Sequence, residues 1–226
     1  VPQIIYYISA YLDAARRGAI KPGEPVNVVV PTGNFGNILA AFYARCMGIN
    51  LKRLICASNA NNVLTEFINT GTYDRSHQFH KTISPSMDIL ISSNLERLLF
   101  EMTGRDAGRV SAWMERLKDL GRYTVEEDVR AKIKEIFWAD YASDEETRRT
   151  IAQIWEKYGY LIDTHTAVGV NVYQKYREAA GDDTPVIIAS TASPYKFGGS
   201  VSQALIGDKA GQWSEFEALQ ALEKLT

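Results

Sequence analysis

The sequence predicts an α/β fold in which a mostly parallel sheet is flanked by helices. Residues 26–30 and 53–58 are apolar runs of the length of a buried strand, and residues 38–45 between them favour a helix. A strand, a helix and a strand at this spacing form a βαβ unit, so the two strands should be parallel. A third apolar run of strand length, residues 185–191, lies near the end of the 226-residue chain.

The composition is that of an ordinary globular protein, with 46% hydrophobic and 23% charged residues and a formal net charge of −2. No basic stripe is present, which disfavours nucleic acids and anionic membranes as partners. No apolar run approaches the ~20 residues that span a bilayer, and no secretion signal is visible. Cys46 and Cys56 indicate buried thiols in a reducing compartment, so we expect a cytoplasmic protein.

The chain starts inside a helical pattern at Val1, without an initiator Met, and we therefore expect that an N-terminal part is missing. The first helix should run from residue 4 to residue 17 and end at Gly18. Its expected apolar face consists of Ile4, Ile5, Ile8, Leu12 and Ala15. A loss of N-terminal sequence would expose apolar surface, so we also expect self-association of the chain.

The segment from Pro31 to Asn37 joins the first strand to its helix and is the main candidate for a binding site. The free N–H groups of such a turn and the positive end of the helix dipole converge on one point, which suits an anion. Gly33 and Gly36 should allow positive φ and close approach of an oxyanion. Asn34 and Asn37 offer side-chain donors and can cap the helix. The spacing matches neither a Walker loop nor a dinucleotide fingerprint, so it fits a single phosphate without a Mg²⁺ ligand; a turn that binds nothing is the alternative.

Helices separated by loops should follow the second strand. One is expected at residues 63–69 and another at residues 95–102, where Asn94 or the serine before it can cap the helix. His77 and His80 are three residues apart, but no Cys and no second pair of ligands accompanies them. Surface histidines are therefore favoured over a metal site, and no metal is predicted.

Residues 109–158 change in character and are interpreted as a helical elaboration of the α/β core. The expected helices, all amphipathic and charged, span residues 110–120, 125–139 and 144–158. The tryptophans that should anchor the core are Trp113, Trp138 and Trp155. Residues 1–108, with the phosphate loop, and residues 159–226 should form the α/β core itself.

The end of the third strand is a second candidate site. Ligands of open α/β sheets lie beyond the carboxyl ends of the strands, so Ser190 and Thr191 should face the same crevice as the phosphate loop. Polar residues that merely close a strand are the alternative. His165 precedes a helix expected at residues 167–180 and is either a hydrogen-bonded structural residue or a site residue. A last helix is expected at residues 214–225.

Several separated blocks of the chain occur in a recognisable order. They are residues 2–7, 31–37, 84–89, 93–97, 163–169 and 190–197. Together they resemble the C-terminal part of threonine synthase, in the branch found in many bacteria and in fungi. The resemblance covers nearly the whole chain and rests on the combination, because the Gly-Asn-Phe-Gly-Asn block is weak alone. It implies the C-terminal part of a fold-type-II pyridoxal phosphate enzyme of the tryptophan-synthase-β group.

The family converts O-phospho-L-homoserine and water to L-threonine and phosphate, so the resemblance implies a lyase of threonine biosynthesis. It implies that the 5′-phosphate of the cofactor is held, largely by backbone N–H groups, at Gly33, Asn34, Phe35, Gly36 and Asn37. It also implies that Thr191 hydrogen-bonds the pyridine nitrogen without holding it protonated, which tunes the ring as an electron sink. Further candidates for the substrate or active site are His165, Lys196 and Ser86.

The chain departs from the family in two ways. Thr164 and Ser193 stand where the family often has proline and histidine, and the second change bears on any role of that histidine. The family's lysine that holds the cofactor as a Schiff base lies in the N-terminal part, with most of the substrate-phosphate pocket, and this sequence lacks both. Lys196 stands at the wrong motif for that role. We therefore expect a fragment with a phosphate cup but no catalytic residue of its own, inactive by itself.

Two other interpretations remain open. A serine/threonine dehydratase-like enzyme shares a Gly-rich phosphate loop, although the blocks at residues 84–89 and 163–169 favour threonine synthase. A non-catalytic module that binds a phosphate ligand would need no further part of the protein. The threonine synthase interpretation requires a small-molecule substrate and the missing N-terminal part of the same chain as partners.

Overall fold

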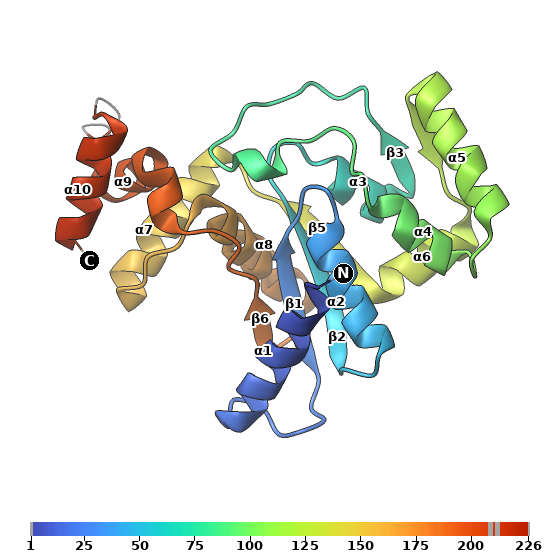
Figure 1. Ribbon diagram of the computed structural model, residues 1–226, viewed down its shortest axis with the longest axis horizontal. Coiled ribbons are helices and arrows are strands. Elements are labelled where there is room, and N and C mark those ends of the chain that lie inside the picture. Colours follow the sequence, from blue (N-terminus) through green and yellow to red (C-terminus); the bar gives the residue numbers. More distant parts are fainter. Residues whose placement is uncertain (1, 208–209, 211–212, 226) are drawn as a thin grey trace.

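The centre of the molecule is a four-stranded parallel sheet. A computed structural model describes residues 2–207, 210 and 213–225 of the chain. The strands lie in the order β5-β2-β1-β6, and each neighbouring pair is parallel (Figure 1). They are β1 (Val26–Pro31), β2 (Leu51–Ser58), β5 (Phe137–Tyr141) and β6 (Val186–Ile188). The predicted α/β class and the parallel βαβ unit are confirmed.

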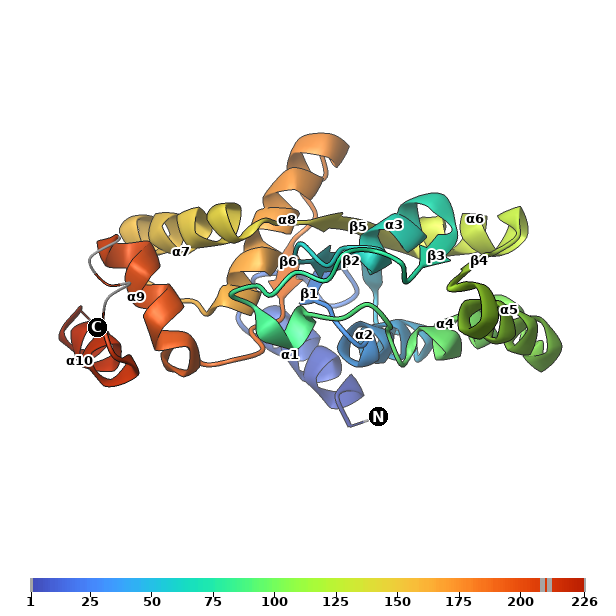
Figure 2. The same cartoon turned by 90° about the horizontal axis from the view of Figure 1, so that it is seen from above.

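Helices cover both faces of this sheet, as Figure 2 shows. α1 (Ile4–Arg16) and α2 (Gly36–Cys46) lie on one side, and α8 (Thr164–Ala180) lies on the other. Successive side chains of a strand point to opposite faces, so Val30 joins the core under α1 and α2, whereas Val29 joins the core under α8. A strand covered on both faces must be apolar along its length, which is why β1 is a continuous buried run.

A helical layer with a small antiparallel sheet extends from the β2 side of the centre (Figure 1). Its elements are α3 (Val63–Thr70), β3 (Thr72–Asp74), α4 (Leu95–Met102), α5 (Ala107–Leu120), β4 (Arg122–Thr124) and α6 (Glu127–Ile136). Buried aromatic rings hold this layer together: Tyr73 and Tyr123 stack with their centroids 5.6 Å apart, and Trp113 stacks on Tyr123 at 6.2 Å. Trp113 is therefore the core anchor that the sequence predicted.

The C-terminal elements gather at the opposite end of the molecule (Figure 1). They are α7 (Asp144–Tyr158), a 3-10 turn η2 (Pro194–Phe197), α9 (Gly198–Ile206) and α10 (Glu215–Leu225). Ile151, Val201 and Leu222, one from each of α7, α9 and α10, share a hydrophobic cluster of their own. The helix α9 was not expected from the sequence, whereas α10 was.

Residues 137–141 form a strand, although the sequence predicted a helix that continued to residue 139. Phe137 points to one face, where its ring lies 5.8 Å from that of Phe35. Trp138 points to the other face and contacts the ring of Tyr176 at 5.2 Å. The segment has apolar side chains on both faces because it is a strand of the central sheet. The sequence pattern missed the change from helical to strand periodicity because a charged helix, α6, comes directly before it. The predicted helix at residues 125–139 is therefore wrong at its end, where residues 137–139 belong to β5.

The predicted apolar face of α1 is wrong in part: Ile4, Ile8 and Ala15 pack against the core, but Ile5 and Leu12 do not. The buried residues of this helix are Tyr7 and Tyr11, whereas Ile5 and Leu12 are 66% and 52% exposed. The tyrosines turn inward because their hydroxyls bond inside the molecule; that of Tyr11 donates to the carbonyl oxygen of Glu24 at 2.9 Å. A hydropathy pattern scores tyrosine as half polar and so misplaces the face.

The cysteines and tryptophans are buried to different extents. Cys56 is buried, as predicted, and this burial raises the pKa of its thiol to about 12. Cys46 is exposed at the end of α2, which corrects the expectation of a buried thiol, and Trp155 is only half-buried. Within the described residues, no helix combines the length and the apolar character needed to cross a membrane.

Replacement of Phe137 by alanine tests the place of β5 in the sheet. Phe137→Ala should lower the free energy of unfolding by about 3 kcal/mol, because the cavity adjoins the rings of Phe35 and Phe42. Phe79→Ala, at a residue that is 53% exposed, should change it by about 0.5 kcal/mol or less. Urea unfolding followed by circular dichroism gives both values, and equal losses would contradict the assignment.

Candidate functional site

The turn between β1 and α2 has an unusual backbone conformation. Phe35 occupies the N-cap position of α2 with φ 63°, in the left-handed region that favours glycine. Its ring is 1% exposed and packs against Phe137, so side-chain burial compensates the backbone strain. The sequence interpretation that placed positive φ at Gly33 and Gly36 is wrong, because both have ordinary φ values.

Gly33 is required by a neighbouring turn. A Cβ atom at this residue would lie only 2.7 Å from the carbonyl oxygen of Ser86, in the 3-10 turn η1 (Pro85–Met87). That oxygen belongs to the backbone and cannot move aside as a flexible side chain would. The glycine therefore lets η1 approach the turn between β1 and α2, and two blocks separated by about fifty residues in sequence come into contact.

The carbonyl groups of the loop are already bonded. The carbonyl oxygen of Gly33 accepts a hydrogen bond from Ser92 Oγ at 3.0 Å, and that of Asn34 accepts one from Asn94 Nδ2 at 2.7 Å. Asn94 stands at the N-cap of α4, but its side chain does not cap that helix as predicted. It holds the loop instead.

The N–H groups of the loop are not bonded. In the described part of the chain, the backbone N–H groups of residues 33–37 donate to no acceptor. No side chain caps α2 either, which corrects the expectation that Asn34 or Asn37 would do so. Free donors at the positive end of a helix dipole suit an anion, although none of these donors carries a formal charge.

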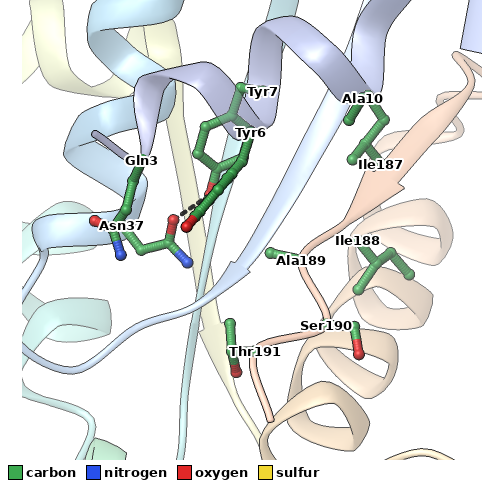
Figure 3. Close-up of a pocket in the computed structure, with 10 residues that line it drawn as sticks. All are labelled: Gln3, Tyr6, Tyr7, Ala10, Asn37, Ile187, Ile188, Ala189, Ser190 and Thr191. Carbon is green, nitrogen blue, oxygen red and sulfur yellow. Dashed lines mark hydrogen bonds between the residues drawn. The ribbon is translucent and has the colours of Figure 1, made fainter. Parts of the chain in front are cut away.

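A cavity of about 390 Å³ lies beside this turn (Figure 3). Its lining comes from α1, the first turn of α2, and the end of β6 with the residues that follow it: Gln3, Tyr6, Tyr7, Ala10, Asn37, Ile187, Ile188, Ala189, Ser190 and Thr191. The cavity thus brings Asn37 together with Thr191, which is an exposed residue. Gly33, Asn34, Phe35 and Gly36 lie in the turn but not in this lining.

The sheet explains why residues about 150 positions apart meet here. β6 pairs in parallel with β1, and the N–H of Ala189 donates to the carbonyl oxygen of Val29 at 2.9 Å. The two strands therefore end at the same edge, where ligands of open α/β sheets bind. Gly169 of α8 packs closely against this edge, since a Cβ atom there would lie only 3.3 Å from Pro31 Cγ.

His165 lies in the first turn of α8, is 3% exposed, and is bonded at both ring nitrogens. The backbone N–H of Ser86 donates to Nε2 at 3.2 Å, so the ring proton is on Nδ1 and donates to Asp163 Oδ1 at 3.0 Å. Burial alone would raise the pKa of Asp163, but hydrogen bonds from His165 and Thr166 hold that pKa below the usual aspartate value. His165 thus links the start of α8 to η1, and it lies outside the lining of the cavity.

The other candidate residues also lie outside this lining. Lys196 is exposed, with its Nζ 5.6 Å from the ring centroid of Phe197. Phe197 packs on His165 with 4.7 Å between ring centroids, so this block contacts the residue that links α8 to η1. Ser86 is exposed and contributes its backbone to η1. None of the cavity-lining residues is a lysine.

The histidines at residues 77 and 80 have no arrangement suited to a metal. His77 Nε2 lies 2.9 Å from Glu66 Oε2, and His80 is exposed. Among the residues that the structure describes, no three or more His, Cys, Asp or Glu side chains are grouped to hold a metal ion.

Sequence reasoning missed three residues that shape the site. Tyr7 donates to Asn37 Oδ1 at 2.8 Å, and Ser92 and Asn94 hold the loop carbonyls. The only available signal was their position inside the recognised blocks or next to them, because a hydrogen bond over 30 or 60 positions has no local pattern.

Comparisons with known proteins show which family the chain resembles. The family model "Threonine synthase, C-terminal" matches residues 166–225. The human protein named threonine synthase-like 1 is 45% identical over 206 residues, which cover 91% of this chain and 27% of that protein. Threonine synthase of Pseudomonas aeruginosa is 40% identical over 205 residues, which cover 91% of this chain and 42% of that enzyme.

A solved structure shares the fold over nearly the whole chain. The pyridoxal phosphate-bound threonine synthase of Brucella melitensis superposes with a TM-score of 0.83 at 37% identity, over 99% of this chain and 49% of that one. The chain thus spans between about a quarter and about half the length of the proteins it matches.

Gly33→Ala tests the close approach of η1 to the loop. The added Cβ meets the backbone of Ser86, so we expect the free energy of unfolding to fall by about 2 kcal/mol. Gly199→Ala is the matched control, because nothing lies within 4 Å of a Cβ there and its φ is ordinary; it should stabilise the protein by about 0.5 kcal/mol. Chemical denaturation measures both, and a neutral Gly33→Ala would show that η1 does not touch the loop.

Proposed function

The chain is homologous to the C-terminal portion of the threonine synthase family, and we propose that it supplies the phosphate-binding side of a pyridoxal phosphate site. The observation that carries the proposal is the set of unpaired N–H groups at residues 33–37, with Asn37 and Thr191 lining one cavity beside them. The site residues themselves are proposed on this geometry together with the family resemblance.

The loop fits a phosphate ester. A dianion needs several converging donors, and here the donors are backbone N–H groups. The carbonyl oxygens of the same turn, at Gly33 and Asn34, are already bonded to Ser92 and Asn94. No lysine or arginine lines the cavity, so the helix terminus and the amides would carry the recognition. Gly33, Asn34, Phe35, Gly36 and Asn37 are the residues that would hold the phosphate.

Thr191 would hold the other end of the cofactor. Thr191 is an exposed residue that follows β6 and lines the cavity, and its hydroxyl can bond a pyridine nitrogen without giving up a full proton. Bound pyridoxal phosphate supplies an electron sink for negative charge at the carbon beside the substrate's amino group. The chain's own contribution is to bind and orient that ring from the phosphate and nitrogen ends.

We propose that the complete natural protein converts O-phospho-L-homoserine and water to L-threonine and phosphate. The identity to the Pseudomonas aeruginosa enzyme supports this reaction over that of a serine/threonine dehydratase, as do the blocks at residues 84–89 and 163–169. These two blocks are in contact, since the backbone N–H of Ser86 donates to His165 Nε2.

We infer that the 226-residue chain alone is inactive. In the family the cofactor is bound to a lysine of the N-terminal part, and no lysine lines the cavity described here. Lys196 is exposed and lies over Phe197, outside the cavity lining. The exposed apolar side chains of α1, Ile5 and Leu12, are the surface that we propose is covered by further sequence or by self-association.

The reaction is tested with the complete natural protein that carries this sequence. It should release inorganic phosphate from O-phospho-L-homoserine, and Thr191→Val should reduce kcat/KM about tenfold or more through loss of one hydrogen bond to the ring. Thr191→Ser keeps the hydroxyl and should retain most of the activity. Release of ammonia from threonine without phosphate release would indicate the dehydratase, and binding of the cofactor with neither reaction would indicate a non-catalytic module.

The inactivity of the isolated chain is tested by borohydride reduction in the presence of pyridoxal phosphate. We expect no single lysine to be modified stoichiometrically, because none lines the cavity. The complete natural protein, treated in the same way, should give one reduced adduct. Mass spectrometry of peptides locates it, and a stoichiometric adduct at one lysine of the 226-residue chain would overturn the inference.

A further inference from the structure

Asn37 brings an ambiguous side chain to the cavity. A carboxamide presents a donor on one side and an acceptor on the other, and only the donor suits an anion. Turned the wrong way, Asn37 would direct an oxygen at a negatively charged ligand. The site therefore needs something that fixes the rotation of this amide.

Tyr7 occupies the place from which this can be done. Its hydroxyl lies 2.8 Å from Asn37 Oδ1, and Figure 3 shows the amide nitrogen of Asn37 directed away from this hydroxyl. Tyr7 is 3% exposed, and α1 packs along α2, so its ring is held in this position. Burial raises the pKa of the Tyr7 hydroxyl well above its usual value. The group is therefore protonated at physiological pH and available as a donor.

We propose that Tyr7 is a positioning residue that turns the Asn37 amide so that Nδ2 faces the ligand and acts only as a donor to a phosphate oxygen. This rests on the proposed function of the loop as a phosphate cup. The bond to Tyr7 occupies Oδ1, so the acceptor is hidden from the ligand while the donor remains free. Tyr7 itself touches Asn37, and its effect on the ligand passes through that residue.

The chemistry of the cavity makes this orientation matter. The lining contains no lysine or arginine to outweigh a misplaced oxygen. Neutral donors must then supply the attraction, and a hydrogen bond to a charged acceptor is stronger than one to a neutral acceptor. The amide of Asn37 adds a side-chain donor to the backbone N–H groups of residues 33–37.

The test compares pyridoxal phosphate with pyridoxal, which lacks the phosphate, as ligands of the complete natural protein. Tyr7→Phe keeps the ring and removes only the hydroxyl. It should weaken binding of pyridoxal phosphate about tenfold and leave binding of pyridoxal unchanged, because only the phosphate meets Asn37. Tyr11→Phe is the matched control: it removes a buried hydroxyl from the next turn of the same helix, one that bonds Glu24 and Gly23 rather than Asn37, and the ratio of the two affinities should not change.

A double-mutant cycle separates positioning from general destabilisation. In an Asn37→Ala background, Tyr7→Phe should have no further effect on the affinity ratio, because the residue through which it acts is gone. An unchanged ratio in Tyr7→Phe, or an equal loss for both ligands, would overturn the role of Tyr7. If the wild-type protein itself binds both ligands equally, the phosphate cup fails as well, so the two proposals are distinguishable.

Discussion

In the turn between β1 and α2 the carbonyl groups are paired and the N–H groups are not. The carbonyl oxygens of Gly33 and Asn34 accept hydrogen bonds from Ser92 and Asn94, while the N–H groups of residues 33–37 have no acceptor in the described part of the chain. Unpaired donors are costly when they are sealed in a core, but here they lie at a surface edge of the sheet, where a ligand can reach them. The left-handed Phe35, locked by its buried ring, fixes this division.

Distant segments converge to hold this turn rigid. The η1 turn fits against Gly33, and a polar network anchors it from behind: Asp88 Oδ1 accepts hydrogen bonds from Asn59 Nδ2 and from Thr82 Oγ1, each at 2.7 Å. On the other side, the backbone of Ser86 is tied to His165 at the start of α8. His165, for which the sequence left a structural role and a site role open, thus takes part in this support. The recognised blocks of the sequence therefore form one connected surface, with the cavity at its edge.

The elements that sequence predicted well are those whose signal is local. β1 is apolar and covered on both faces, and α7 carries its own capping box between Ser143 and Glu146, so neighbours along the chain suffice to define them. The strand β5 was not predicted, because its apolar residues directly follow a charged helix and only the pairing with β2 makes them a strand. The helix α1 was predicted, but its buried tyrosines were missed because the inward direction of Tyr7 and Tyr11 depends on acceptors in other segments.

The sequence by itself determined the α/β class, the position of the glycine-containing turn between a strand and a helix, and the recognisable order of the family's blocks. These follow from short-range propensity, turn composition and residue identity, which are all present in the linear chain. The sequence predicted a shared crevice but left open that Thr191 merely closes a strand, and the tertiary structure decided that Asn37 and Thr191 share a cavity. Only the tertiary structure decided that Gly33 makes room for η1 and that His165 is bonded at both ring nitrogens. Those facts depend on which strands pair and which turns touch, and such long-range contacts are fixed by the packing of the whole chain.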